Sequence, residues 1–169
     1  MSRKWRRFTV FHDYGKADSK DIEAFEKKYN ICLPESYKEL MLEHNGGSFE
    51  EDHFDFTNRW GREDGRTFLF KSFGEKRKGK ELIEDAQFVS KPDYYGVPGL
   101  IGIGSTAEGD TLCFDYRDDP DTCEPKVVLL VHDEYEEDEN GNTHMLIEPI
   151  ADSFDEFLDM LYRYEDDEE

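Results

Sequence analysis

Residues 19–47 of the chain read SKDIEAFEKKYNICLPESYKELMLEHNGG, and this stretch contains two helical patterns with start and stop signals. Ser19 is a typical N-cap residue and predicts a first helix over about residues 20–28. The apolar residues of that helix recur at helical spacing and share one face: Ile22, Phe25 and Tyr29. The stretch therefore predicts an amphipathic helix that ends before Pro34.

The second helical pattern starts at Pro34, because proline suits the first turn of a helix. Its apolar stripe consists of Tyr37, Leu40, Met41 and His44. His44 is therefore expected to be a core histidine. The pattern stops at Asn45-Gly46-Gly47, where glycine can take the left-handed conformation that ends a helix. The N-terminal part of the chain is thus predicted to be a helical pair.

Beyond these glycines the apolar period changes to the alternation that is typical of β-strands. Phe54 alternates with Phe56, and Phe68 alternates with Phe70. Asn140-Gly141 is a strong signal for the tip of a β-hairpin. Further strands are expected over residues 100–104, 111–116, 126–132 and 145–147, with a short amphipathic helix over residues 80–88 before them. The sheet is therefore predicted to be mostly antiparallel.

The last helix has the clearest local signal, because Ser153 followed by Glu156 forms a capping box. Its buried stripe consists of Phe154, Phe157, Leu158, Leu161 and Tyr162. The predicted fold class is α+β, with a central, mostly antiparallel sheet and both the N-terminal helical pair and the C-terminal helix packed on one side. Residues 1–18 are expected to form a basic arm and a first strand, residues 19–164 a single domain, and residues 165–169 a disordered acidic tail.

The order of these motifs resembles a known family. The pattern Ile22-x-x-Phe25-Glu26-x-x-Tyr29-x-x-x-Leu33-Pro34-x-x-Tyr37-x-x-Leu40 leads to Asn45-Gly46-Gly47, and Ile150-Ala151-Asp152-Ser153-Phe154-x-x-Phe157-Leu158 follows after the strands. Together they resemble the SUKH superfamily, whose eukaryotic members include the Smi/Knr cell-wall assembly regulators. The resemblance implies a binding protein, since bacterial members are largely immunity proteins that neutralise a cognate toxin, often a nuclease.

The charge of the chain is strongly acidic and unevenly distributed. Asp and Glu number 42 against 21 Lys and Arg among 169 residues, which gives a net charge of −21. Residues 1–100 have a net charge of −1 and residues 101–169 a net charge of −20. Most of the surface would repel a phosphate backbone, so direct binding to nucleic acid is disfavoured.

Export and membrane insertion are not expected. No stretch approaches the roughly 20 apolar residues of a membrane-spanning helix, and the basic start lacks the apolar core of a signal peptide. The three cysteines, Cys32, Cys113 and Cys123, show no C-x-x-C spacing. Neither a disulfide nor a zinc site is therefore predicted, and a reducing cytoplasm fits best.

Catalytic and cofactor motifs are weak. The segment 102–107 matches the dinucleotide pattern G-x-G-x-x-G/A, but Glu108-Gly109-Asp110 turns into another strand instead of a helix. Residues 136–141 resemble the start of a calcium loop, but the position of the bidentate ligand would be Ile147. The five histidines show no metal-ligand spacing. We therefore expect no enzyme, no cofactor and no metal.

A basic protein is the expected partner, and the candidate contacts are acidic side chains and one aromatic side chain. Trp60 is a candidate anchor because aromatic residues beside arginines are typical of interfaces, although it could instead close the edge of the core. For Tyr94 and Tyr95 the similar alternative is that their loop packs on the sheet. The candidate partner-binding residues are Glu50, Glu51, Asp52, Asp55, Trp60, Asp118, Asp119, Asp121, Glu134, Glu136, Glu137, Asp138 and Glu139.

Three functional hypotheses follow. The first is a cytoplasmic immunity protein whose acidic surface covers a basic toxin, expected to be a nuclease. The second is a regulatory scaffold of the Smi/Knr type. The third is a domain that binds a small ligand or a cation at the acidic face. The oligomeric state stays open.

Overall fold

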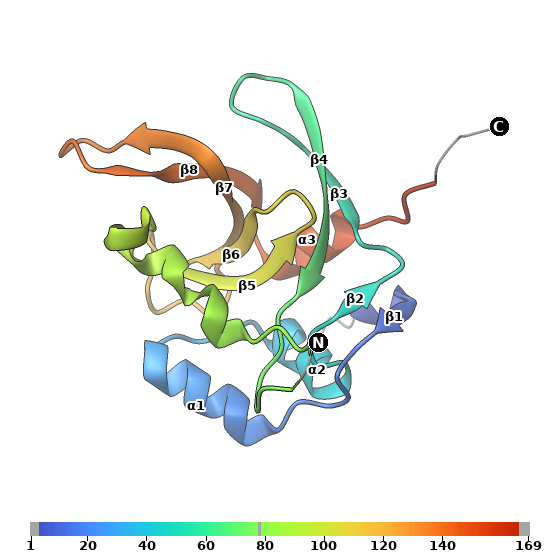
Figure 1. The fold of residues 1–169 in the computed structure, drawn as a ribbon. Coiled ribbons are helices and arrows are strands. Elements are labelled where there is room, and N and C mark those ends of the chain that lie inside the picture. The colour runs from blue at the N-terminus through green and yellow to red at the C-terminus, as the bar shows by residue number, and fades with distance from the viewer. Residues whose placement is uncertain (1–3, 78, 166–169) are drawn as a thin grey trace.

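The computed structural model describes residues 4–77 and 79–165. Its main feature is a six-stranded antiparallel sheet in which spatial neighbours are also consecutive along the chain (Figure 1). The strands are β3 (His53–Thr57), β4 (Glu63–Phe70), β5 (Leu100–Thr106), β6 (Thr111–Asp115), β7 (Lys126–Glu137) and β8 (Thr143–Ala151). Strands β1 (Val10–His12) and β2 (Ser48–Phe49) form a separate antiparallel pair. The predicted antiparallel sheet is confirmed.

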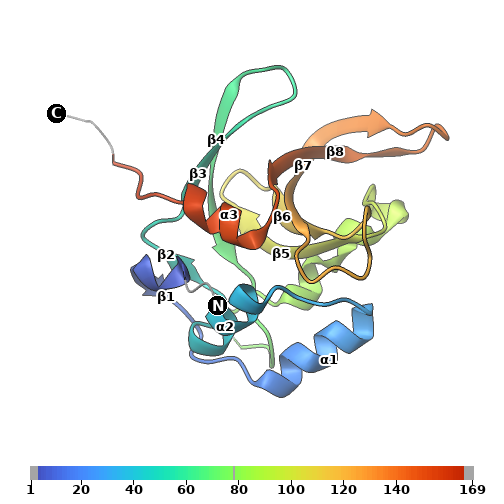
Figure 2. The same ribbon diagram turned by 180° about the vertical axis from the view of Figure 1, so that it is seen from behind.

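Three α-helices pack on one side of the six-stranded sheet. They are α1 (Ser19–Tyr29), α2 (Glu35–Glu43) and α3 (Phe154–Met160). Figures 1 and 2 show that the sheet bends so that β3–β4 and β7–β8 rise as two arms at its opposite ends. The α+β class with the helices packed on the sheet is therefore confirmed.

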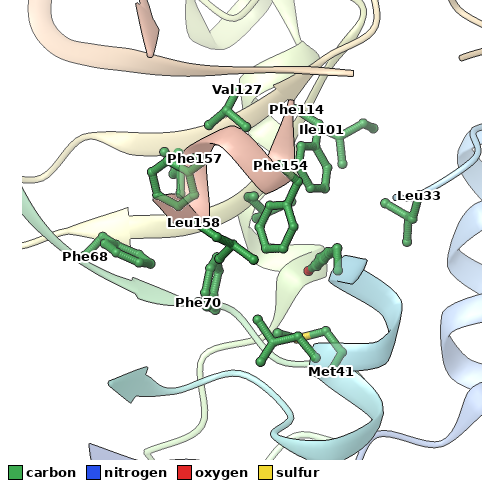
Figure 3. Close-up of a cluster of buried hydrophobic side chains, with 14 of the residues drawn as sticks. Leu33, Met41, Phe68, Phe70, Ile101, Phe114, Val127, Phe154, Phe157 and Leu158 are labelled. Carbon is green, nitrogen blue, oxygen red and sulfur yellow. The ribbon is translucent and has the colours of Figure 1, made fainter. Parts of the chain in front are cut away.

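The main core lies between α2, α3 and the sheet, and it is largely aromatic (Figure 3). The ring of Tyr37 lies 5.1 Å from that of Phe114 and 5.4 Å from that of Phe154. Phe157 contacts Phe54 with ring centroids 5.3 Å apart. Aromatic side chains bury large apolar areas, so this cluster fixes α3 against strands that lie far from it in the sequence.

The opposite face of the sheet has its own smaller core. The 3-10 helix η2 (Ile83–Ser90) covers it and contacts β5. Val89, Leu100 and Cys113 are fully buried there. The helix predicted over residues 80–88 thus exists, but it starts later, is a 3-10 helix and lies on the second face.

The helix starts and stops differ in detail from the sequence prediction. Asp18, not Ser19, caps α1, since its carboxylate accepts a hydrogen bond from the Lys20 N–H. The second helix ends at His44 without a left-handed glycine cap. Gly47 has a φ of +80° and lies so close to the His12 carbonyl that an added Cβ would be 2.0 Å away. Gly47 is therefore needed for the close approach of this segment to β1.

His44 is not the core histidine that its helical position predicted. Its side chain is about one third exposed, and its Nδ1 lies 2.7 Å from the Asp13 carboxylate. The helix ends at this residue, so the ring points to the edge of the core, where Asp13 can hydrogen-bond to it.

The predicted Ser153 cap of α3 is confirmed, but the Glu156 carboxylate reaches the N–H of the preceding residue instead of that of Ser153. The Ser153 hydroxyl accepts from the Glu156 N–H, and the Glu156 carboxylate accepts from the Asp152 N–H. The other end of α3 is closed by Arg7 of the 3-10 helix η1 (Lys4–Arg7), which donates to the carbonyls of Leu158 and Leu161. Part of the predicted basic arm thus satisfies carbonyls that a helix end leaves open. Residues 1–3 and 166–169 lie outside the described residues.

The prediction of no disulfide is wrong. Cys32 and Cys123 are bonded, with their Cα atoms 4.7 Å apart. The bond joins the α1–α2 connection to the loop between β6 and β7, across a sequence separation of 91 residues. Cysteine spacing could not reveal this pair because only the fold brings the two loops together. Cys113 is a free, buried cysteine.

In the part of the chain that the structure describes, no helix has the length and apolar character needed to cross a bilayer. This finding agrees with the expectation drawn from the short apolar runs of the sequence.

Candidate functional site

An open groove of about 600 Å³ lies beside the β7–β8 arm. The loop after β6 and the N-terminal end of α3 form its other sides. Five carboxylates line it: Asp115, Asp118, Glu136, Asp152 and Glu156. Three groups that carry or can acquire positive charge also line it: Arg117, Lys126 and His144. We call this hollow the acidic groove.

Two of the basic groups in the acidic groove are already paired. The Arg117 guanidinium forms two 2.9 Å hydrogen bonds to the Asp115 carboxylate, which raise the Arg117 pKa. Lys126 lies 3.4 Å from Asp118, whose side chain remains 83% exposed. An exposed pair of this kind contributes little to stability. Asp118 is therefore accessible to an incoming cation.

Arg59 connects the two arms of the sheet. It lies in the β3–β4 turn and forms an ion pair with Glu136 of β7. Its Nη2 also donates to the Ile147 carbonyl, and its Nε lies 3.6 Å from the carboxylate of Glu148. Glu148 is only 3% exposed, so Arg59 supplies the positive charge that its burial requires. No local sequence signal revealed Arg59, because its partners lie far away in the sequence.

The outer edge of β8 is blocked at three alternate residues. The Met145 N–H donates to the Tyr95 carbonyl, and the Ile147 carbonyl accepts from Arg59. Pro149 has no N–H to offer. An edge strand protected in this way does not readily accept another strand. A partner would therefore contact side chains on this arm.

Some of the predicted acidic residues meet in space. Asp118, from the β6–β7 loop, and Glu136, from β7, both line the acidic groove. Asp121 borders a different hollow, next to Cys32. The neighbouring Asp119 accepts a hydrogen bond from the Asp121 N–H and shapes the loop.

The other acidic candidates of β7 and its turn follow the extended arm. Strand β7 runs to Glu137, beyond the predicted end at residue 132, because it pairs with β8 as far as Thr143. Asp138 accepts N–H groups from Asn140 and Asn142, and these hydrogen bonds lower the Asp138 pKa. Asp138 thus holds the hairpin turn, while Glu134, Glu137 and Glu139 are exposed.

The four acids of the 50–55 region lie away from the acidic groove and hold the chain ends. Glu50 pairs with Arg163, and Glu51 accepts from the Thr9 N–H. Asp55 accepts from the Tyr162 hydroxyl at 2.9 Å. Partial burial raises the pKa of Asp52. These contacts give Glu50, Glu51 and Asp55 a structural role at the chain ends.

The candidate aromatic residues are exposed. Trp60 is 61% exposed in the β3–β4 turn, directly after Arg59, so the alternative that it closes the edge of the core is wrong. Tyr94 and Tyr95 are 61% and 49% exposed. The backbone of their loop does pack on the sheet, through the Tyr95 carbonyl, but the two rings point outward.

The catalytic and metal motifs have structural explanations. Gly102 and Gly104 are in β5, where an added Cβ would lie 2.7 Å from the Ala86 carbonyl oxygen and 2.6 Å from that of Leu69. Residues 136–141 form the end of β7 and its turn. Among the residues that the structure describes, no group of three or more His, Cys, Asp or Glu side chains is arranged to hold a metal ion.

Sequence inspection missed a charge cluster around the buried Asp110, at the base of the β7–β8 arm. Asp110 is 2% exposed and lies 2.7 Å from Arg66 Nε and 2.7 Å from His132 Nδ1. Asp133 lies 3.3 Å from the other ring nitrogen of His132. The hydrogen bond to Asp110 raises the His132 pKa. The cluster fixes the irregular segment of β7 that redirects the arm.

The raised pKa of His132 makes stability depend on pH. Protonated His132 stabilises the folded state fully below the unfolded pKa of about 6.5, and this contribution is lost as pH rises through the folded pKa. We expect the unfolding free energy of the wild type, relative to His132→Gln, to fall above about pH 6.5. Urea titrations between pH 5 and 9 would measure this difference, with His12→Gln as the control. A difference that is constant with pH would contradict the assignment.

Comparisons with known proteins give one relative and one family. YobM of Bacillus subtilis (strain 168), whose name describes it as an uncharacterized protein, is 33% identical over 78 residues. The match covers 46% of this chain and 41% of YobM. No solved structure matches the chain at a significant level. The family model of the SMI1/KNR4 proteins (SUKH-1) matches residues 16–160, from the start of the helical pair to the end of α3. The chain therefore belongs to the SMI1/KNR4 (SUKH-1) family.

Proposed function

We propose that this chain is a non-enzymatic immunity protein that neutralises a basic toxin domain by covering it. The observation that carries the proposal is the acidic groove, where Asp118 and Glu136 meet on a hollow beside an acidic hairpin arm. The net charge of −20 over residues 101–169 surrounds this hollow with negative potential. Such a field accelerates encounters with a basic protein and disfavours nucleic acid.

A nuclease is the toxin class that fits this surface best. A nuclease must hold phosphate groups, so its active cleft is lined by basic side chains. The acidic groove offers carboxylates at positions fixed by a disulfide-linked loop and by the Arg59 contacts. A rigid surface loses little conformational entropy on binding. The proposed location is the cytoplasm, because the toxin would reach its substrate there; the Cys32–Cys123 disulfide removes the argument from cysteine usage.

The first experiment is to capture the tagged chain from its own cells at low and at moderate salt and to identify the bound proteins by mass spectrometry. We expect one basic protein that is toxic when expressed alone and harmless when co-expressed with this chain. Recovery of cell-wall or signalling factors instead would favour the regulatory-scaffold hypothesis. A calcium-dependent rise in the melting temperature would favour the cation-binding hypothesis.

A charge-neutralised variant tests the electrostatic step. We expect Asp118→Asn/Asp119→Asn/Glu137→Gln to slow association with the captured toxin by about tenfold at low salt and to flatten the salt dependence. These three carboxylates avoid Glu136 and Asp138, which hold the fold together. Stopped-flow association at several salt concentrations gives the rates.

The control has the same change in net charge on the helical pair: Glu23→Gln/Glu35→Gln/Glu43→Gln. If both triple variants slow association equally, the acidic surface of the β6–β7 loop and the β7–β8 arm has no special role and only the overall charge matters.

A further inference from the structure

Three tyrosines form an exposed aromatic surface where the loop after η2 meets the β7–β8 arm. Tyr94, Tyr95 and Tyr135 are 61%, 49% and 52% exposed. The rings of Tyr95 and Tyr135 pack edge to face, with centroids 5.2 Å apart. Tyr94 ends the 3-10 helix η3 (Pro92–Tyr94), so the surface joins segments about 40 residues apart. We call these residues the tyrosine patch.

Two residues in or beside the tyrosine patch have a strained, left-handed backbone. Tyr95 has a φ of +60°, in the left-handed region that bulky side chains rarely adopt. Asp133, two residues before Tyr135, has a φ of +63°. Asn30 is the third non-glycine residue with a positive φ among the described residues. It lies at the C-cap of a helix, where asparagine adopts this conformation easily. Strained positions of this kind cluster at functional sites.

The strained loop is nevertheless held firmly. The Tyr95 carbonyl accepts from the Met145 N–H at 2.8 Å, and the Val97 N–H donates to the Val89 carbonyl at 2.7 Å. Gly96 packs so tightly that an added Cβ would lie 2.4 Å from the Val89 carbonyl oxygen. The backbone that carries the Tyr95 ring is therefore held in place. The ring itself is half exposed, so its burial contributes little to stability.

Carboxylates accompany the tyrosine patch. Asp93 precedes Tyr94, and Glu137 lies two residues after Tyr135, on the same face of β7. An arginine side chain matches this combination, because its planar guanidinium stacks on an aromatic face and also pairs with carboxylates. A lysine ammonium is a strongly hydrated point charge and matches it less well.

We propose that the tyrosine patch is the docking surface for arginine side chains of the basic protein partner. The proposal rests on the proposed function in one respect, namely that the partner is a basic protein. It adds a preference between basic side chains. The acidic groove attracts lysine and arginine alike, whereas the tyrosine patch selects arginine. The strain at Tyr95 is retained because an asparagine or glycine there would fold more easily but would not bind.

Short peptides of six arginines and of six lysines test this selectivity directly. We expect the arginine peptide to bind about fivefold more tightly than the lysine peptide at the same salt concentration, which corresponds to roughly 1 kcal/mol. In two-dimensional ¹H–¹⁵N NMR spectra, the arginine peptide should shift the amide signals of Tyr94, Tyr95 and Tyr135 more than the lysine peptide does.

The test variants are Tyr95→Asn and Tyr135→Ser. Asparagine tolerates the left-handed conformation, so Tyr95→Asn should melt at the same or a higher temperature than the wild type while losing the preference for arginine. Phe11→Ser is the matched control, since Phe11 is 76% exposed on β1, at the other side of the molecule (Figure 1). It should retain the preference.

Equal affinity for the two peptides, or an unchanged preference in both tyrosine variants, would overturn the proposal. These outcomes are independent of the toxin experiment. A toxin captured from cells that binds Tyr95→Asn and Tyr135→Ser as tightly as the wild type would contradict the tyrosine patch and leave the immunity function standing. If the chain prefers the arginine peptide but no toxin is captured, the immunity function is contradicted and the tyrosine patch stands.

Discussion

Replacing Asp110 with alanine is expected to lower the free energy of unfolding by about 3 kcal/mol, because it leaves a largely buried cation without its main partner. The Asp110 carboxylate contacts Arg66 Nε, His132 Nδ1 and the His132 N–H, at 2.7, 2.7 and 3.0 Å. Arg66 is only 12% exposed and would retain one carboxylate, that of Asp64, and the Gly65 carbonyl. Urea denaturation at pH 7 measures the loss.

Two comparisons make this prediction specific. Asp110→Asn keeps the shape and part of the hydrogen bonding, so it should lose less than alanine does. Glu139→Ala removes an exposed carboxylate of the β7–β8 turn and should change the unfolding free energy by less than about 0.5 kcal/mol. A loss below 1 kcal/mol for Asp110→Ala would mean that the buried cluster does not support the β7–β8 arm.

Removing the Cys32–Cys123 disulfide is expected to cost about 4 kcal/mol. The bond closes a loop over a sequence separation of 91 residues, and a cross-link of this length strongly restricts the unfolded chain. Cys32→Ser/Cys123→Ser should therefore unfold at a much lower urea concentration than the oxidised wild type. Denaturation curves with and without a reducing agent measure the same difference in the wild type.

The serine double variant is also the control for the reducing agent, which should not change its unfolding midpoint. A thiol assay on the denatured, unreduced wild type should detect one free thiol, that of Cys113. Three free thiols and a midpoint insensitive to reduction would show that the cysteines are not paired. The disulfide also anchors the loop that carries Asp118, so its loss should loosen one side of the acidic groove.

The local elements of this fold could be predicted because their signals lie within a few residues of each other. The Ser153 and Glu156 side chains close the first turn of α3 through bonds to adjacent backbone N–H groups. Asn140-Gly141 specifies the β7–β8 turn in the same way, since Gly141 has a φ of +80°. The helical spacing after Pro34 likewise placed α2 to within a residue or two.

The candidate site could be predicted only in part. The excess of acidic residues after position 100 is a property of composition, and it indicated a basic partner before any fold was known. Which carboxylates face a partner depends on their contacts. Glu50 and Asp55 contact Arg163 and Tyr162, whereas Asp118 stays exposed at the acidic groove.

The sequence by itself therefore determined the helices, the hairpins and the sign of the charge, because these depend on neighbouring residues or on composition. Only the tertiary structure decided the Cys32–Cys123 bond, the Arg59 bridge and the Asp110 cluster, because each joins residues from distant parts of the chain. The left-handed backbone of Tyr95 was likewise decided only by the tertiary structure. Its left-handed backbone is imposed by contacts of its loop with the sheet, and no local pattern predicts a tyrosine there.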